Sequence, residues 1–391
     1  MGEVTLQSVG VTAAKAPDAA RDEVGLSWTA LDTPALLVDL DRLEANVATM
    51  ADHARRGGVS LRPHFKTHKS VAIADRQLSA GAVGVTVAKL DEAETLIAAG
   101  VDASILIANE LVSVAKLERA LSLATRCRLI LAVDSAEGAT RLAHAASAAG
   151  LVVDVSIEID SGLARCGVAP SDAPELARAI SSHRSLRLTG MFTHAGQSYA
   201  ARSVAEVAAI AELEARSVVE AARATRAIGI PVETISAGST PTARFLDGDS
   251  GLTEIRPGTY VFFDSLQVAL GSARLDDCAL SVATTVVSRP VPDRAVVDAG
   301  SKTLGLDRGA HSSSLLDDYG TVIDGEGALV RLSEEHGVMR ITPGSPLAIG
   351  DRLRIVPNHA CTVSNLGRRF YGLRDGVVSE VISIDAAGGV H

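Results

Sequence analysis

The feature that most constrains the fold of this chain is an alternation of short aliphatic runs with helix-like segments, from residue 34 to about residue 240. The segments between the runs are rich in Ala, Leu, Glu and Arg at helical spacing, and several end in glycine, as helices often do. Eight strands separated by helices predict a closed (β/α)8 barrel of the TIM type, with a doubly wound open sheet as the alternative. The predicted strands are Ala35–Leu40, Ser60–His64, Ala82–Ala88, Ser104–Ala108, Arg128–Val133, Val153–Asp160, Leu186–His194 and Thr234–Gly238.

The pattern changes after about residue 270. From there to the end, β-like segments are joined by turns rich in Gly, Pro and Asp, and no helix of useful length is expected. The sequence therefore predicts an N-terminal arm at residues 1–32, a barrel at residues 33–270 and an all-β domain at residues 271–391.

Bulk composition excludes several classes of function. A net charge of -10 and a pI near 5.5 argue against nucleic acid as a partner. No run approaches the roughly 18 apolar residues that would span a membrane, and the first thirty residues lack the pattern of a signal peptide. The four cysteines are widely spaced and form no CxxC pair, which favours reduced thiols and a cytoplasmic location.

The segment Arg62–Lys69 is unusually rich in basic side chains. If it is extended, alternate residues share one face of the strand. Repulsion among the groups on that face, together with partial burial, would lower the pKa of Lys66. A lysine with a lowered pKa can act as a Schiff-base nucleophile. A basic strand edge or a phosphate-binding patch is the alternative interpretation. The face would carry Arg62, His64, Lys66 and His68.

Polar residues follow several of the predicted strands, where a (β/α)8 barrel places its chemistry. Lys66 follows the second strand, and Arg165 lies in the loop after the sixth. His194 and Tyr199 lie at the end of the seventh. The loop Gly238–Thr242 follows the eighth, and its N–H and hydroxyl groups can bind a phosphate. An ordinary turn, a histidine that caps backbone carbonyls and a solvent-facing arginine are the alternative interpretations.

His359 and Cys361 follow the predicted strand Arg352–Val356. On extended backbone, residues two apart point the same way, and an imidazole nitrogen with a thiolate sulfur suits zinc. Two protein ligands are fewer than a catalytic zinc normally has, so water or substrate would complete the shell. A buried cysteine beside a hydrogen-bonded histidine is the alternative interpretation.

These motifs resemble those of the fold-type III pyridoxal-phosphate enzymes, the alanine-racemase-like class, from about Thr33 to Ile384. More narrowly, they resemble the metal-activated branch that contains D-serine dehydratase, D-threo-3-hydroxyaspartate dehydratase and D-threonine aldolase. The resemblance implies that Lys66 carries the cofactor and that His359 and Cys361 bind the metal. The other cofactor contacts that it implies are Arg165 beside the ring and its 3-hydroxyl, His194 against the pyridine ring, Tyr199 in the same stretch, Gly238, Ser239 and Thr240 at the phosphate, and Tyr260 at the phosphate or the ring.

The resemblance also implies an activity. We expect a lyase that depends on pyridoxal phosphate and a divalent metal, with zinc first and manganese or magnesium as alternatives. The expected reaction converts D-serine or D-threo-3-hydroxyaspartate to a 2-oxo acid and ammonia, because such dehydratases typically carry His-x-Cys. The alternative is a D-threonine aldolase-type cleavage to glycine and an aldehyde, whose metal motif is more often His-x-Asp. In either case a homodimer that acts on small-molecule D-amino acids is expected.

In the dehydratase version, Lys66 removes the α-proton, the metal assists departure of the β-hydroxyl, and Arg165 and His194 hold the ring in place. Two further classes fit less well. An amino-acid racemase would need a second acid/base, for which Tyr260 and Tyr199 are candidates, and it leaves the metal pair unexplained. A non-catalytic cofactor carrier usually lacks the β domain that residues 271–391 predict.

Overall fold

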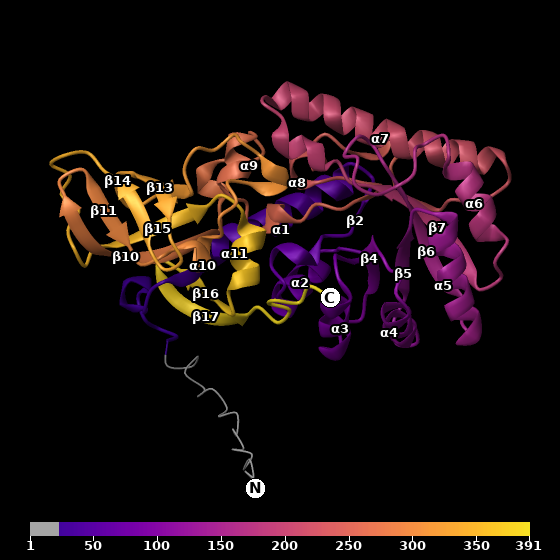
Figure 1. Ribbon diagram of the computed structural model, residues 1–391, viewed down its shortest axis with the longest axis horizontal. Helices are drawn as coiled ribbons and strands as arrows, with labels where there is room; N and C mark the ends of the chain where they lie inside the picture. The colour runs from indigo at the N-terminus through magenta and orange to yellow at the C-terminus, as the bar shows by residue number, and fades with distance from the viewer. Residues whose placement is uncertain (1–22) are drawn as a thin grey trace, which may run out of the picture.

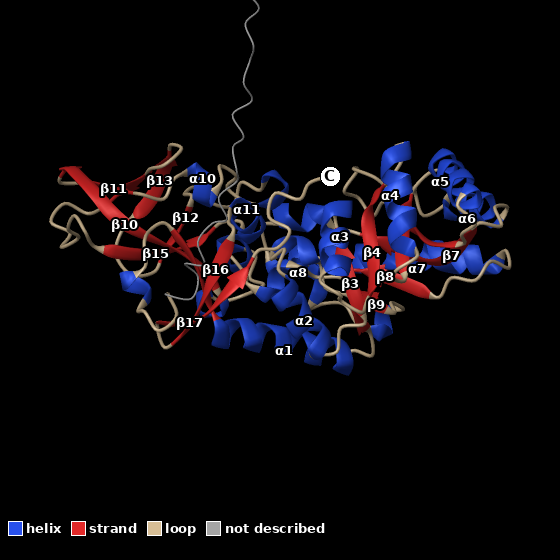
Figure 2. Ribbon diagram, turned by 90° about the horizontal axis from the view of Figure 1, so that it is seen from below, coloured by secondary structure: helices blue, strands red, loops and turns tan. Residues whose placement is uncertain are grey.

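The computed structural model describes residues 23–391, which fold into a barrel at one end and a mainly antiparallel sheet at the other (Figure 1, Figure 2). The barrel has eight parallel strands in the order β2-β9-β8-β7-β6-β5-β4-β3. A single parallel bridge between His64 and Thr86 joins the two ends of this order, so the barrel is nearly closed and the predicted (β/α)8 fold is confirmed. The strands are β2 (Ser60–Leu61), β3 (Gly84–Val87), β4 (Ser104–Glu110), β5 (Leu129–Val133), β6 (Val153–Ile159), β7 (Leu186–Thr193), β8 (Thr234–Ala237) and β9 (Glu254–Ile255).

Helices follow the barrel strands, and Figure 1 shows α4 to α7 along the outside of the barrel. Serine side chains begin several of them: Ser113, Ser135 and Ser203 each accept a hydrogen bond from the N–H three residues later. Gly100 and Gly150 follow α3 and α5 in the left-handed conformation that glycine favours. The helices are α1 (Leu40–Arg56), α2 (Val71–Ser79), α3 (Leu90–Ala98), α4 (Val114–Ala124), α5 (Ala136–Ala148), α6 (Ala173–Ser181), α7 (Val204–Ala227) and α8 (Thr240–Ala243).

The first strand predicted for the barrel belongs to the other sheet. β1 (Ala35–Asp39) pairs antiparallel with β10 and parallel with β16. Its first four residues are buried, so its sequence looks like that of a buried barrel strand. The eighth barrel strand is instead β9, whose two residues are too few for periodicity to reveal.

The C-terminal sheet has nine strands, including β1. Short helices also occur in this part of the chain, and the metal-pair segment begins one of them, α11, where sequence predicted extended backbone. The strands are β10 (Leu280–Val291), β11 (Arg294–Val297), β12 (Gly320–Val322), β13 (Ala328–Leu332), β14 (Gly337–Arg340), β15 (Arg352–Pro357), β16 (Arg369–Arg374) and β17 (Val377–Ser383). The helices are α9 (Ser265–Ala269), α10 (Ser301–Leu304) and α11 (Ala360–Leu366).

The N-terminal part of the chain packs on the C-terminal sheet. Leu43 and Val47 of α1 share a buried cluster with Val282 and Phe370 of that sheet. Of the predicted arm, residues 1–22 lie outside the described residues, whereas Leu31 is buried in the packed structure. Among residues 23–391, no helix is long and apolar enough to cross a membrane.

Candidate active site

A cavity of about 260 Å³ opens at the carboxyl ends of the barrel strands. This is the end at which (β/α)8 barrels place their chemistry. Six of the predicted site residues lie on its wall, and their convergence from separate loops is the main agreement between sequence and structure. They are Lys66, Arg165, His194, Tyr199, Ser239 and Thr240.

Lys66 lies in a 3-10 turn, Phe65–Thr67, directly after β2. Burial lowers the pKa of its amine, and the nearby cations Arg165 and Arg256 lower it further, against the opposing effect of Cys361. The direction agrees with the prediction from sequence, but the source of the repulsion does not. Arg256 directly follows β9, the strand that pairs with β2, and Arg165 lies in the loop after β6, so neither cation is a neighbour on the same strand.

The predicted basic strand face is wrong, because the chain leaves the extended conformation and turns at Phe65–Thr67. Arg62 points to a buried ion pair with Glu254, with 2.8 Å between Nε and Oε2. His68 is fully buried, and its Nε2 lies 3.2 Å from Oε1 of Gln77. Arg62 and His68 therefore serve the barrel packing, whereas His64 and Lys66 of the predicted face both line the cavity.

The loop after β8 forms the part of the cavity wall predicted to bind phosphate. Gly238 has a φ of 107°, a left-handed conformation that glycine accepts without strain. Ser239 and Thr240 follow it on the wall, and the Thr240 hydroxyl accepts a hydrogen bond of 3.1 Å from the backbone N–H of Tyr260. The hydroxyl groups of Ser239 and Thr240 thus lie where an anionic group can enter.

Tyr260 itself does not lie on the cavity wall. Its side chain is fully buried, and its hydroxyl accepts a hydrogen bond of 2.9 Å from Nε2 of Gln77. The predicted side-chain contact with the cofactor therefore does not fit this geometry, and only the backbone of Tyr260 approaches the phosphate loop. Sequence alone could not separate these possibilities, because a buried tyrosine and a site tyrosine look the same.

Glu214 on α7 is a residue that sequence reasoning missed. One of its carboxylate oxygens accepts hydrogen bonds of 3.0 Å from the backbone N–H groups of Ala195 and Gly238. It therefore ties the loop of His194 to the phosphate loop. Burial raises its pKa, while these hydrogen bonds oppose that shift. An acidic residue among the buried apolar positions of α7 was the available signal.

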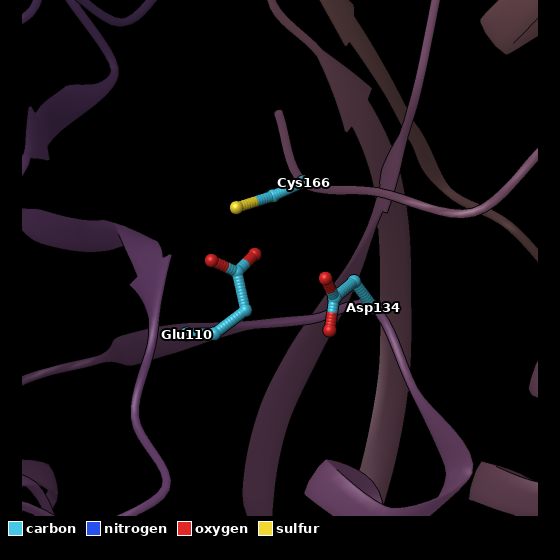
Figure 3. A group of neighbouring side chains, drawn as sticks. All are labelled: Glu110, Asp134 and Cys166. Atoms are coloured by element: carbon cyan, nitrogen blue, oxygen red, sulfur yellow. The ribbon is translucent and has the colours of Figure 1, made fainter. Parts of the chain in front are cut away.

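Acidic side chains lie behind Arg165. A guanidinium nitrogen of Arg165 lies 3.4 Å from Oε1 of Glu158. Burial is the larger cause, and the neighbouring Glu110 the second, of the rise in the pKa of Glu158 to about 8. Figure 3 shows Glu110, at the end of β4, together with Asp134 and Cys166, which lie in the loops after β5 and β6. One carboxylate oxygen each of Glu110 and Asp134 and the sulfur of Cys166 lie within 4.8 Å of one another, and Glu110 and Cys166 line the cavity.

His311 is a second residue that sequence reasoning missed. It comes from the C-terminal domain and lies against the barrel rim, with its Nε2 3.4 Å from Nε2 of His194. Its ring centroid is 5.2 Å from that of Tyr199. Burial, and then the positive charges of Lys66 and Arg165, lower its pKa to about 4. His311 therefore lies at the rim, beside His194 and Tyr199, which line the cavity.

The predicted metal pair lies at the start of α11. His359 is the residue before the helix and Cys361 lies in its first turn, so the pair is not on an extended strand. Sγ of Cys361 is 3.3 Å from the hydroxyl of Thr67, which neighbours Lys66, and 3.9 Å from that of Thr259. Thr67 and Thr259 both line the cavity, so the pair lies directly behind its wall.

The electrostatics of this pair favour a thiolate beside a protonated imidazole. Burial lowers the pKa of His359, but Cys361 and Asp307 outweigh it and raise that pKa to about 10, so a metal would displace the imidazole proton. Burial raises the pKa of Cys361, but His359 and Lys66 outweigh that effect and the net shift is downward, toward the thiolate. Nδ1 of His359 is bonded to a carboxylate oxygen of Asp307, which leaves Nε2 as the free ring nitrogen. The Thr362 hydroxyl donates to the same carboxylate at 3.0 Å. A thiolate and an oriented imidazole are the donors that a zinc-like ion takes.

Comparisons with known proteins agree with this architecture. The chain matches the families described as alanine racemase, N-terminal domain, over residues 38–266, and putative serine dehydratase domain, over residues 279–373. D-threo-3-hydroxyaspartate dehydratase of Delftia sp. (strain HT23) is 42% identical over 350 residues, which cover 85% of this chain and 91% of that protein. The structure of D-threonine aldolase from Filomicrobium marinum is similar with a TM-score of 0.87 at 36% identity, over 94% of this chain and 99% of that one. A D-threo-3-hydroxyaspartate dehydratase variant solved in a metal-free form gives a TM-score of 0.85 at 37% identity, over 92% of this chain and 98% of that one.

Proposed function

Because the chain belongs to the alanine-racemase-like, fold-type III pyridoxal-phosphate family with a serine dehydratase domain, we propose that it is a lyase of D-β-hydroxy amino acids. The observation that carries this proposal is the meeting of two kinds of chemistry at one cavity. Lys66, half-buried and with a lowered pKa, lies next to Thr67, whose hydroxyl contacts the thiol of Cys361. Relatives with this architecture include a dehydratase and an aldolase of such substrates.

The residues present fit pyridoxal phosphate. Lys66 offers a nucleophilic amine for the cofactor aldehyde, and Ser239 and Thr240 offer donors for the phosphate. A β-carbon on Gly258 would lie 2.9 Å from the Thr67 hydroxyl, so the glycine keeps that side of the cavity open. Arg165 and His194 lie on the remaining wall, where they would hold the ring. When bound, the cofactor supplies an electron sink and the metal supplies a Lewis acid.

Within this arrangement Lys66 would accept the α-proton of the substrate at Nζ once its amine is free. His359 and Cys361 would hold the divalent metal through Nε2 and Sγ, with Asp307 fixing the orientation of the imidazole. The ring centroids of His194 and His311 lie 5.4 Å apart at the rim of the cavity.

We favour dehydration to a 2-oxo acid and ammonia over retro-aldol cleavage to glycine and an aldehyde. The support is the His-x-Cys metal motif at His359 and Cys361, which resembles that of the dehydratases. The 42% identity to the Delftia dehydratase points the same way, whereas the similarity to the Filomicrobium aldolase keeps cleavage as the second candidate. The two reactions differ in whether the β-oxygen leaves or loses its proton.

Three finer assignments belong to the same proposal. Zinc is the metal that a thiolate and an imidazole favour, with manganese and magnesium as alternatives. A cytoplasmic location is supported by four free cysteines among the described residues. A homodimer is proposed by analogy within the family, and light scattering on the purified protein measures it directly.

The experiment that tests the function is a product assay. Purified protein loaded with pyridoxal phosphate and zinc is incubated with D-serine, D-threonine and D-threo-3-hydroxyaspartate, and ammonia, 2-oxo acid, glycine and aldehyde are measured separately. Ammonia without glycine supports the dehydratase, and glycine with aldehyde supports the aldolase. Lys66→Ala should abolish turnover, whereas Lys302→Ala, a control at an exposed lysine, should not. Full turnover by Lys66→Ala, or activity that EDTA leaves unchanged, would contradict the proposal.

A further inference from the structure

A buried ion pair lies beside the cavity and takes no part in the chemistry proposed above. Nζ of Lys69 is 2.9 Å from Oε1 of Glu92, and the two side chains are only 7% and 1% exposed. Lys69 also has a φ of 52°, the left-handed conformation that residues with a β-carbon rarely adopt. Burying two charges and straining the backbone both cost free energy, and a buried ion pair is weak evidence for stability. The pair therefore calls for another explanation.

The pair joins two walls of the cavity. The backbone N–H of Lys69 donates to the carbonyl of Phe65 at 2.8 Å, which closes the turn that carries Lys66. The second oxygen of Glu92 accepts a hydrogen bond of 2.7 Å from the backbone N–H of Ala88. Ala88 lines the cavity at the end of β3. The Lys66 turn is thus tied to the neighbouring loop after β3 through this charged contact, in addition to the bridge between His64 and Thr86.

The C-terminal segment completes this contact. Nζ of Lys69 donates to the carbonyl of Gly389 at 2.7 Å, and the carbonyl of Lys69 accepts from the N–H of Ala386 at 3.0 Å. Asp385 accepts from the N–H of Val71 at 2.8 Å, at the start of α2. Figure 1 shows this end of the chain beside α2 and α3. The segment thus lies along the base of the Lys66 turn.

The same segment reaches the helix of the metal pair. The N–H of Gly388 donates to the side-chain oxygen of Asn365 at 3.2 Å. Asn365 belongs to α11, which begins directly after His359 and contains Cys361. A continuous series of contacts therefore runs from the Lys66 turn, through Lys69 and the C-terminal segment, to the metal helix, beside the direct contact between Thr67 and Cys361.

We propose that Lys69, Glu92 and residues 385–389 form a brace that sets the position of Lys66 relative to His359 and Cys361. Lys69 is then a positioning residue, which acts through the Lys66 turn and α11 rather than on the substrate. The proposal rests on the proposed function, because it takes the lysine and the metal pair to act on one substrate. A fixed separation between the two matters, because catalytic groups must be held in one geometry to act together.

The test separates positioning from stability. Lys69→Met or Glu92→Leu alone leaves one buried charge unpaired and should destabilise the fold, whereas the double variant replaces both charges by apolar groups. We expect the double variant to lose less stability to urea than either single variant, because no charge is left unpaired, although the N–H of Ala88 and the carbonyl of Gly389 lose their partners. It should bind zinc about two- to thirtyfold more weakly than the unaltered protein. The circular dichroism band of the bound cofactor should also change, because it reports cofactor orientation. The control removes the exposed pair Lys302 and Glu334 in the same way and should change none of these measurements.

A double variant with wild-type zinc affinity and wild-type cofactor dichroism would overturn the proposal. The ion pair of Lys69 and Glu92 would then contribute only to packing. If the double variant does not fold, Asn365→Leu decides, because it cuts only the link from the C-terminal segment to α11. We expect it to fold and to lower zinc affinity by about two- to thirtyfold. Unchanged affinity would overturn the brace. If the unaltered protein binds neither cofactor nor zinc, the proposed function itself is wrong. If the unaltered protein binds both and the variants bind them equally well, only the brace is wrong.

Discussion

Glu214 offers the sharpest test of how the cavity is built. Its carboxylate accepts two backbone N–H groups, from Ala195 and Gly238, both at 3.0 Å, and the residue is fully buried. In Glu214→Ala both donors lose their acceptor in a region that excludes water. Each buried donor left without a partner costs about 1–3 kcal/mol, so the loss of unfolding free energy should be about 2–6 kcal/mol.

Two further variants separate this effect from others. Glu214→Gln keeps an amide oxygen that can accept both N–H groups, so it should lose much less stability than Glu214→Ala. Glu212→Ala removes an exposed carboxylate from the same helix and should change the unfolding free energy by no more than about 0.5 kcal/mol. Urea unfolding of the cofactor-free proteins gives the three values.

The same variants should affect the cofactor. Because Glu214 holds the phosphate loop at Gly238 and the loop of His194, Glu214→Ala should weaken cofactor binding by about tenfold, equivalent to ~1.4 kcal/mol. Equilibrium titration followed by cofactor absorbance measures this. If Glu214→Ala matched Glu212→Ala in both stability and cofactor affinity, the carboxylate would not organise the cavity and the reasoning would be refuted.

Three other changes have definite expected outcomes. Gly196→Ala would place a β-carbon 2.7 Å from Cε1 of His311, so it should displace that ring and lower kcat/KM, and an unchanged kcat/KM would show that the rim contact is irrelevant. Asp307→Asn removes the carboxylate that orients His359 and should weaken metal binding by about 10–100-fold in a metal titration, whereas wild-type affinity would argue against that role. Glu158 has a pKa raised from 4.5 to about 8 in the folded protein. The stability that this group contributes to the unfolding free energy is therefore fully present below pH 4.5 and is lost as the pH rises through about 8. Glu158→Gln should flatten this fall of unfolding free energy with pH, and parallel curves for the two proteins would contradict the assignment.

The barrel could be predicted from the sequence because its strands are regular and its helices are well capped. The errors fell where a strand gives no periodic signal or fits either sheet. β1 (Ala35–Asp39) is buried like a barrel strand, and only its pairing with β10 and β16 assigns it to the other sheet. β9 (Glu254–Ile255) is too short to show alternation, although the buried Glu254 has a structural role in pairing with Arg62.

The candidate site was likewise predicted only in part from the sequence. Lys66 stood out because of its basic neighbours, although Arg62 and His68 turned out to face the packed interior. Glu214 and His311 were missed, because each acts through a contact between loops that are far apart in the sequence. Such contacts depend on the tertiary arrangement, which the order of residues along the chain does not display.

The central claim is that one amine, that of Lys66, holds the cofactor in a cavity next to the metal pair. Borohydride reduction of the cofactor-loaded protein, followed by peptide mass spectrometry, locates the modified amine directly. The account predicts that the pyridoxyl group is found on Lys66 in the unaltered protein. Finding it on Lys89, which lines the same cavity, or on the ion-paired Lys69 would contradict the account.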